Sequence, residues 1–62
     1  MTFKQVVKRL RDAGWRIKNQ EGGHVHMTHE KIPGKVTIPR HGKKDLKPGT
    51  LSAIAKHARL KF

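Results

Sequence analysis

The chain has 62 residues, enough for one compact domain but not two because the surface fraction that a chain can bury falls as it shortens, so residues 1–62 are expected to form a single domain. It has no cysteine, which excludes a disulfide framework and a thiolate zinc site. It has no segment near the ~20 apolar residues that span a bilayer and no apolar leader, which favours a cytoplasmic location without a membrane partner. Fifteen Lys and Arg against four Asp and Glu residues give a formal net charge of +11, which favours a nucleic acid partner, with release of its counterions, over a membrane or a merely solvated surface.

Apolar residues near the N-terminus recur at helical spacing. They are Phe3, Val6, Val7, Leu10 and Ala13, which fall on one stripe of an amphipathic helix. Thr2 precedes them as an N-cap, and Gly14 stands where a helix often ends in the left-handed conformation. The pattern predicts a helix over residues 3–13.

Three segments with a period of two follow. Residues 15–18 alternate between apolar and basic, and the polar residues 19–23 are expected to form a turn. Residues 24–28 alternate again, and the Pro-Gly pair in residues 31–34 predicts a second turn. Residues 35–38 alternate in the same way, with Pro39 ending the segment. The sequence therefore predicts three consecutive strands.

A basic loop over residues 40–47 precedes a second helical stripe. Pro48 suits the first turn of a helix, and apolar spacing extends the helix to residue 58. This order predicts an α+β fold similar to the double-stranded-RNA-binding domain (dsRBD), namely helix, strand, strand, strand, helix, with both helices on one face of a three-stranded antiparallel sheet. The expected core is Phe3, Val6, Val7, Leu10, Trp15, Ile17, Val25, Met27, Val36, Ile38, Leu46, Leu51, Ile54 and Leu60.

Strand alternation predicts which side chains occupy the sheet face away from the helices, here called the open face. If Val25 and Met27 point at the helices, their strand neighbours must point the other way. The open face is then expected to carry Arg16, Lys18, His24, His26, Thr28, Lys35 and Thr37. Histidines among basic side chains suggest a surface on which a phosphodiester could lie.

Histidine is the candidate for proton transfer because its side chain titrates near neutral pH without help. A neutral imidazole could take the proton of a ribose 2′-OH while Lys and Arg stabilise charge on the phosphate. His24 is favoured because Gly22 and Gly23, which precede it, let a substrate approach closely, although an exposed strand residue without a role is an equal reading. His26 is a possible second proton carrier, with a polar filler of the face the favoured alternative, and His41 is held in reserve.

The other candidate sites in the sequence are discounted. His29 and His57 are interpreted as structural. A metal site at His24 and His26 lacks a third ligand and would be surrounded by positive charge, so no metal or other cofactor is expected. The Gly22-Gly23 pair lacks the rest of a phosphate-loop or dinucleotide motif.

Several stretches, in order and spacing, resemble the HicA family of bacterial and archaeal toxins, also called YcfA-like mRNA interferases. They are residues 7–15, 22–27, 36–41 and 43–51 followed by Ile54 and Lys56, which together span nearly the whole chain. The resemblance implies a dsRBD-like fold, metal-independent cleavage of mRNA and inhibition by a HicB-type antitoxin. The family's catalytic histidine follows a Gly-Ser pair and maps onto His24, with Gly23 at the serine position.

The sequence thus predicts a toxin that cleaves mRNA as an endoribonuclease with His24 as its reactive residue. The cations expected to bind RNA are Arg16, Lys18, Lys35, Arg40, Lys43 and Lys44. The alternatives are a non-catalytic RNA-binding module of the same fold and an interaction domain whose basic face docks an acidic partner. The antitoxin is expected to be comparatively acidic and to cover the His24 face in a hetero-complex.

Overall fold

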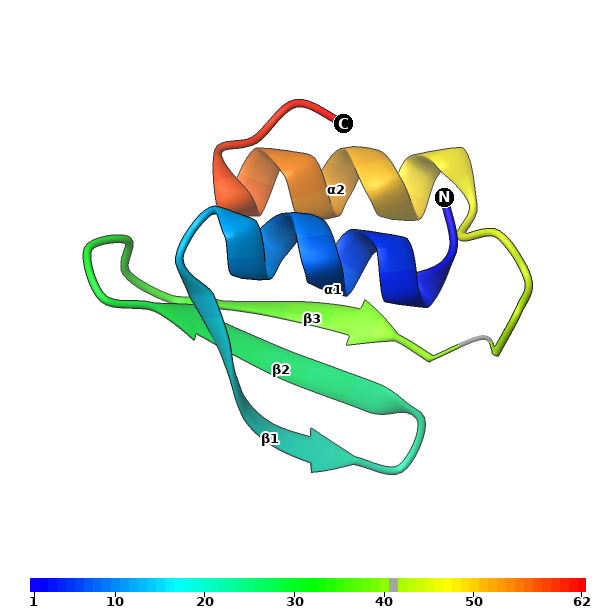
Figure 1. The fold of residues 1–62 in the computed structure, drawn as a ribbon, viewed down its shortest axis with the longest axis horizontal. Coiled ribbons are helices and arrows are strands. Elements are labelled where there is room, and N and C mark those ends of the chain that lie inside the picture. Colours follow the sequence, from blue (N-terminus) through cyan, green and yellow to red (C-terminus); the bar gives the residue numbers. More distant parts are fainter. Residues whose placement is uncertain (41) are drawn as a thin grey trace.

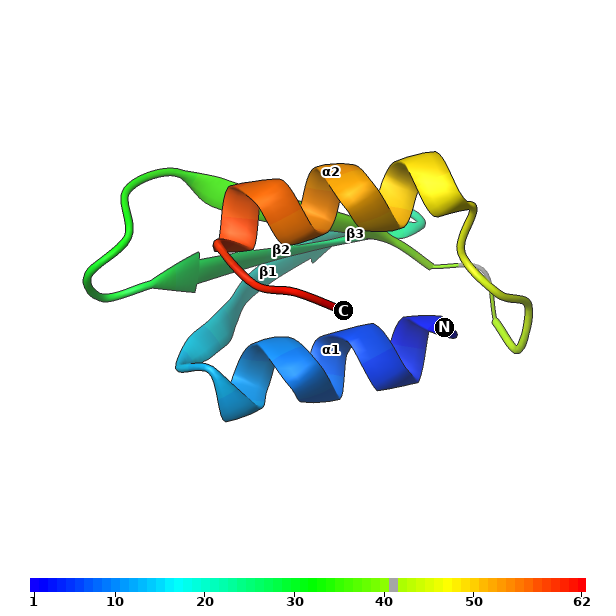
Figure 2. The ribbon, with the colours of Figure 1, turned by 90° about the horizontal axis from the view of Figure 1, so that it is seen from above.

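The protein is described by a computed structural model covering residues 1–40 and 42–62. The elements are α1 (Phe3–Asp12), β1 (Trp15–Glu21), β2 (His24–His29), β3 (Lys35–Pro39) and α2 (Pro48–Ala58). The strands form one antiparallel sheet in the order β1-β2-β3, and both helices cover the same face of it (Figures 1 and 2). The predicted α+β arrangement is confirmed.

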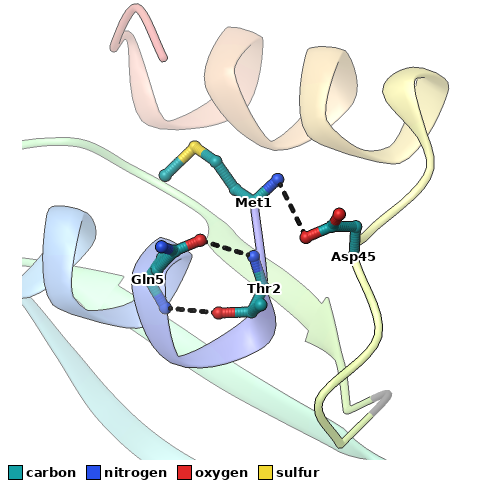
Figure 3. A network of polar contacts seen from close by, with 4 residues as sticks. All are labelled: Met1, Thr2, Gln5 and Asp45. Carbon is teal, nitrogen blue, oxygen red and sulfur yellow. Dashed lines mark hydrogen bonds and ion pairs between the residues drawn. The ribbon is translucent and has the colours of Figure 1, made fainter.

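Thr2 and Pro48 mark where the two helices begin. Thr2 accepts a hydrogen bond from the Gln5 backbone N–H at 3.3 Å, and its own N–H donates to Gln5 Oε1 at 2.9 Å (Figure 3). This capping box satisfies two donors that the first turn leaves free. Pro48 occupies the first turn of α2, as predicted, and α1 ends one residue before the predicted boundary.

The core lies between the sheet and the two helices. Its buried residues are Val6, Leu10, Trp15, Val25, Met27, Val36, Ile38, Leu46, Ile54 and Ala58. All but Ala58 were predicted. The other predicted core residues, Phe3, Val7, Ile17, Leu51 and Leu60, are half-buried and pack against this cluster at its rim. Such a small core leaves several large side chains only partly covered.

The turn between the first two strands differs from the prediction. Residues 19–21 belong to β1, and only Gly22 and Gly23 connect it to β2. Gly22 has φ +55°, and a positive φ at the first central residue is the type II′ pattern that suits a two-residue hairpin. The prediction of a five-residue turn was wrong because two glycines suffice, while the polar residues before them tolerate exposure on an edge strand.

A β-bulge interrupts the alternation of β1. Ile17 pairs with Met27 and Asn19 pairs with His26, so Lys18 is an extra residue without a partner across the ladder. A bulge of this kind changes which face the following residues occupy. Simple alternation from Trp15 would put Glu21 on the helix side, whereas the bulge pairs Glu21 with His24.

Neither described helix is long and apolar enough to cross a membrane.

Candidate functional site

His24 is the first residue of β2 and is exposed to solvent. Its backbone partners are Glu21 on one side and Pro39 on the other. The Arg40 N–H donates to the Gly23 carbonyl at 2.6 Å, which ties the turn before His24 to the end of β3. Because the neighbouring Val25 is buried against the helices, the His24 side chain lies on the open face, as the alternation predicted.

His26 lies two residues further along the same face and is half-buried. Two residues of a strand span roughly 6.6 Å, so the two imidazoles are neighbours on the open face. His26 Nδ1 is 2.9 Å from Thr37 Oγ1 on β3. This hydrogen bond orients the His26 ring and leaves its Nε2 available.

The open face also carries a cross-strand row of polar residues at its far end. Arg16 pairs with Thr28, and Thr28 pairs with Lys35. Residues paired across an antiparallel ladder share a face, so the two cations flank the Thr28 hydroxyl. Both are exposed, as is Lys18 in the bulge. The structure therefore brings Arg16 and Lys35 to the predicted face.

The cations after β3 are arranged differently. Arg40 Nη1 donates to Gln20 Oε1 at 3.4 Å, and its guanidinium carbon lies 5.7 Å from the centroid of the Phe3 ring. Gln20 pairs with the inward-facing Val25, so this guanidinium lies toward the helix layer beside the His24 turn. Lys43 and Lys44 are exposed in the loop before α2. His41, the reserve candidate, lies outside the described residues.

His29 is structural, as predicted, because both of its ring nitrogens are engaged. The Lys31 N–H donates to His29 Nδ1 at 2.9 Å, so the other nitrogen carries the proton and donates to the Ala13 carbonyl at 3.0 Å. The ring also meets Trp15 edge-on at 5.3 Å between centroids. His57 is exposed in the last turn of α2, on the helix layer.

Glu21 is a residue that sequence reasoning missed. It is the one acidic residue in the three strands, and it lies directly opposite His24. Directly opposed residues have Cβ atoms roughly 4.5–5.5 Å apart, which puts the carboxylate near the imidazole. In the described residues Glu21 makes no ion pair with His24, and its Oε1 accepts a hydrogen bond from Asn19 Nδ2 at 3.5 Å. Only the bulge at Lys18 produces this pairing, and the alternating pattern gave no signal of it.

The described residues contain no cluster suited to a metal ion. Residues 1–40 and 42–62 hold no group of three His, Cys, Asp or Glu side chains close enough to bind one. What the site offers is an exposed imidazole, a second imidazole held by a hydroxyl, one carboxylate and several cations. Such a set can move a proton and bind a phosphate.

Comparisons with known proteins bear on the whole chain. A family model described as the HicA toxin of bacterial toxin-antitoxin systems matches residues 3–60. A chain in a solved HicA3 and HicB3 toxin-antitoxin complex is 30% identical, with a TM-score of 0.85 over 100% of this chain and 98% of that chain. No curated protein matches this chain.

Proposed function

The chain belongs to the HicA toxin family, and from this premise we propose that it is an endoribonuclease that cleaves mRNA with His24 as the residue that moves the proton. The observation that carries the proposal is the exposed His24 side chain on a basic face, directly after a turn without side chains. A buried ring could not reach an RNA strand. An exposed ring at the end of a strand can.

The chemistry begins with a ribose 2′-OH. A neutral His24 ring takes the hydroxyl proton as the 2′ oxygen forms a bond to the adjacent phosphorus. The bond from phosphorus to the 5′ oxygen of the next nucleotide breaks, and that oxygen must receive a proton. The products are a 2′,3′-cyclic phosphate and a 5′-hydroxyl, so atoms and charge balance without any metal or cofactor.

His26 supports a second role in this scheme. Its Nδ1 is held by Thr37 and its Nε2 is free, so a protonated ring could deliver the proton to the leaving oxygen. Arg16 and Lys35 flank Thr28, four residues along β2 from His24, so they bind phosphates further along the RNA and add affinity rather than rate. General acid or base catalysis supplies about 10²-fold to 10⁴-fold.

The test is cleavage of RNA by purified His24→Ala protein in the presence of a chelator. We expect a loss of cleavage of about 10²-fold to 10⁴-fold and a loss of growth arrest. His57→Ala is the matched control, because it removes an exposed imidazole from the helix layer. If the His24 variant cleaves RNA as fast as the parent, the assignment is wrong. If the RNA stays intact with the parent as well as with the His24 variant, and binds both in a salt-dependent way, the non-catalytic RNA-binding module is favoured.

A HicB-type antitoxin is the protein partner that this proposal includes. The similar solved chain belongs to a HicA3 and HicB3 complex, and the +11 charge of the present chain favours a comparatively acidic partner. We expect the antitoxin to cover the open face and to protect His24 from chemical modification of its imidazole. Equal modification of His24 with and without the antitoxin would argue for inhibition from elsewhere.

A further inference from the structure

A groove lies at the end of the sheet opposite to His24. It is a hollow of about 840 Å³ between the end of α1, the start of β1 and the end of β2. Its lining includes three basic residues, Arg11, Arg16 and Lys31, together with Thr28 and one acidic residue, Glu30. In Figure 1 this end of the hairpin is at the left, where α1 leads into β1, and the turn before His24 is at the right.

The walls of this groove are held together by His29. Its two ring nitrogens bond to Ala13 in the connection from α1 to β1 and to Lys31 after β2. Gly14, between α1 and β1, has φ +97°, and a Cβ there would come within 2.8 Å of His29 Nε2. The imidazole thus lies close against the backbone and joins the connection between α1 and β1 to the segment after β2.

The groove is continuous with the open face. Arg16 and Thr28 line the groove and also form the row that ends at Lys35. Thr28 and His24 are four residues apart on β2, a distance of roughly 13 Å. A stacked strand advances about 3.4 Å per nucleotide, so roughly four nucleotides separate the two positions.

We propose that this groove is an anchoring site for the RNA phosphate backbone, about four nucleotides away from the bond that is cleaved. The inference rests on the proposed function, because it takes the same RNA strand across His24 and into the groove. Arg11 and Lys31 are the new phosphate contacts, and Arg16 joins the two regions. RNA is favoured over an acidic protein because the groove adjoins the open face, and the scissile phosphate lies on that same face in the proposed function.

The experiment measures RNA binding to His24→Ala protein, so that the outcome does not depend on cleavage. Arg11→Gln with Lys31→Gln removes two charges from the groove. Lys47→Gln with Lys56→Gln removes two exposed charges from α2 and its N-cap and is the matched control. Fluorescent RNAs of two lengths are titrated at several salt concentrations. At ~3.4 Å per nucleotide, an RNA of 3 nucleotides covers about one of the two positions, and an RNA of 12 nucleotides covers more than the distance from His24 to the groove.

We expect the groove variant to lower the salt slope of 12-nucleotide binding by about 1.4, which is about 0.7 for each lost contact to a single strand. Its loss of affinity should be roughly fivefold or more greater for the 12-nucleotide than for the 3-nucleotide RNA. The α2 variant should keep the parental slope. Equal slopes for the two double variants, or a loss of affinity independent of RNA length, would each overturn the proposal.

Discussion

His24 and Gly23 form the smallest unit on which the proposed chemistry depends. Gly23 stands where the family pattern that the chain resembles has serine, and it does not have the positive φ of Gly22. A Cβ built on Gly23 meets no atom within 4 Å. The backbone can therefore accept a side chain at this position, although the position directly before it needs glycine.

Gly23→Ser is expected to fold normally and to cleave RNA faster than the parent. The added hydroxyl can orient the His24 ring or donate to a phosphate oxygen, and one hydrogen bond of this kind is worth about 0.5–1.5 kcal/mol, or roughly twofold to tenfold in rate. Single-turnover cleavage of a short RNA measures the change. Gly22→Ser is the contrasting variant, because a side chain at φ +55° is strained. An unchanged or slower rate for Gly23→Ser would show that the hydroxyl has no such role here.

Glu21 is expected to assist His24 by stabilising the imidazolium that forms when the ring accepts a proton. Glu21→Gln keeps the shape of the side chain and removes its charge. An exposed cross-strand pair is worth about 0.2–1 kcal/mol, so the turnover number should fall by up to about fivefold with KM little changed. Asp12→Asn on α1 removes an acid from an exposed ion pair with Lys8 and serves as the control. Equal turnover by the Glu21 variant and the parent would show that Glu21 does not assist His24.

At the scale of elements, periodicity predicted most of the fold and part of the site. Val25 and Met27 in the central strand are buried as the alternation requires, which is why His24 and His26 were placed on the open face. The bulge at Lys18 could not be predicted, because the residues that follow it, Asn19 and Gln20, are polar and tolerate either face. The pairing of Glu21 with His24 follows from that bulge. The groove was also missed, because His29 joins two segments that are distant in sequence.

The connection from α1 to β1 gives an element-scale prediction about stability. Gly14→Ala places a side chain at φ +97° and against the His29 ring, so we expect a loss of about 1–3 kcal/mol in the free energy of unfolding. For a domain of this size that corresponds to a fall in Tm of about 4–8 °C per kcal/mol. Gly49→Ala in α2, where a Cβ meets no atom within 4 Å, should be neutral or slightly stabilising. Equal Tm values for the two variants would contradict the described packing.

For the whole molecule, a small core and a high positive charge both lower the stability of the folded chain. Among the residues that the structure describes, ten are buried, and they support a chain whose formal charge is +11. Self-repulsion at that charge opposes compaction. Any partner that binds only the folded chain and neutralises this charge must stabilise it. We therefore expect both the antitoxin and the RNA to stabilise the folded chain.

A HicB-type antitoxin should raise the Tm of this chain in a concentration-dependent way. At a free antitoxin concentration of about 100 times Kd, the stabilisation is about 2.7 kcal/mol. Differential scanning fluorimetry of the His24→Ala protein, which can be produced without toxicity if His24 is the reactive residue, measures the shift. A Tm independent of antitoxin concentration would show that the partner does not recognise the folded toxin.

The most direct test of the central claim is the chemistry of the cleaved RNA ends. If His24 removes the proton of a 2′-OH, the upstream product must end in a 2′,3′-cyclic phosphate and the downstream product must begin with a 5′-hydroxyl. A single 2′-deoxy substitution at the nucleotide before the cleaved bond must then abolish cleavage at that bond. Products with a 5′-phosphate, or undiminished cleavage of the substituted RNA, would contradict the account.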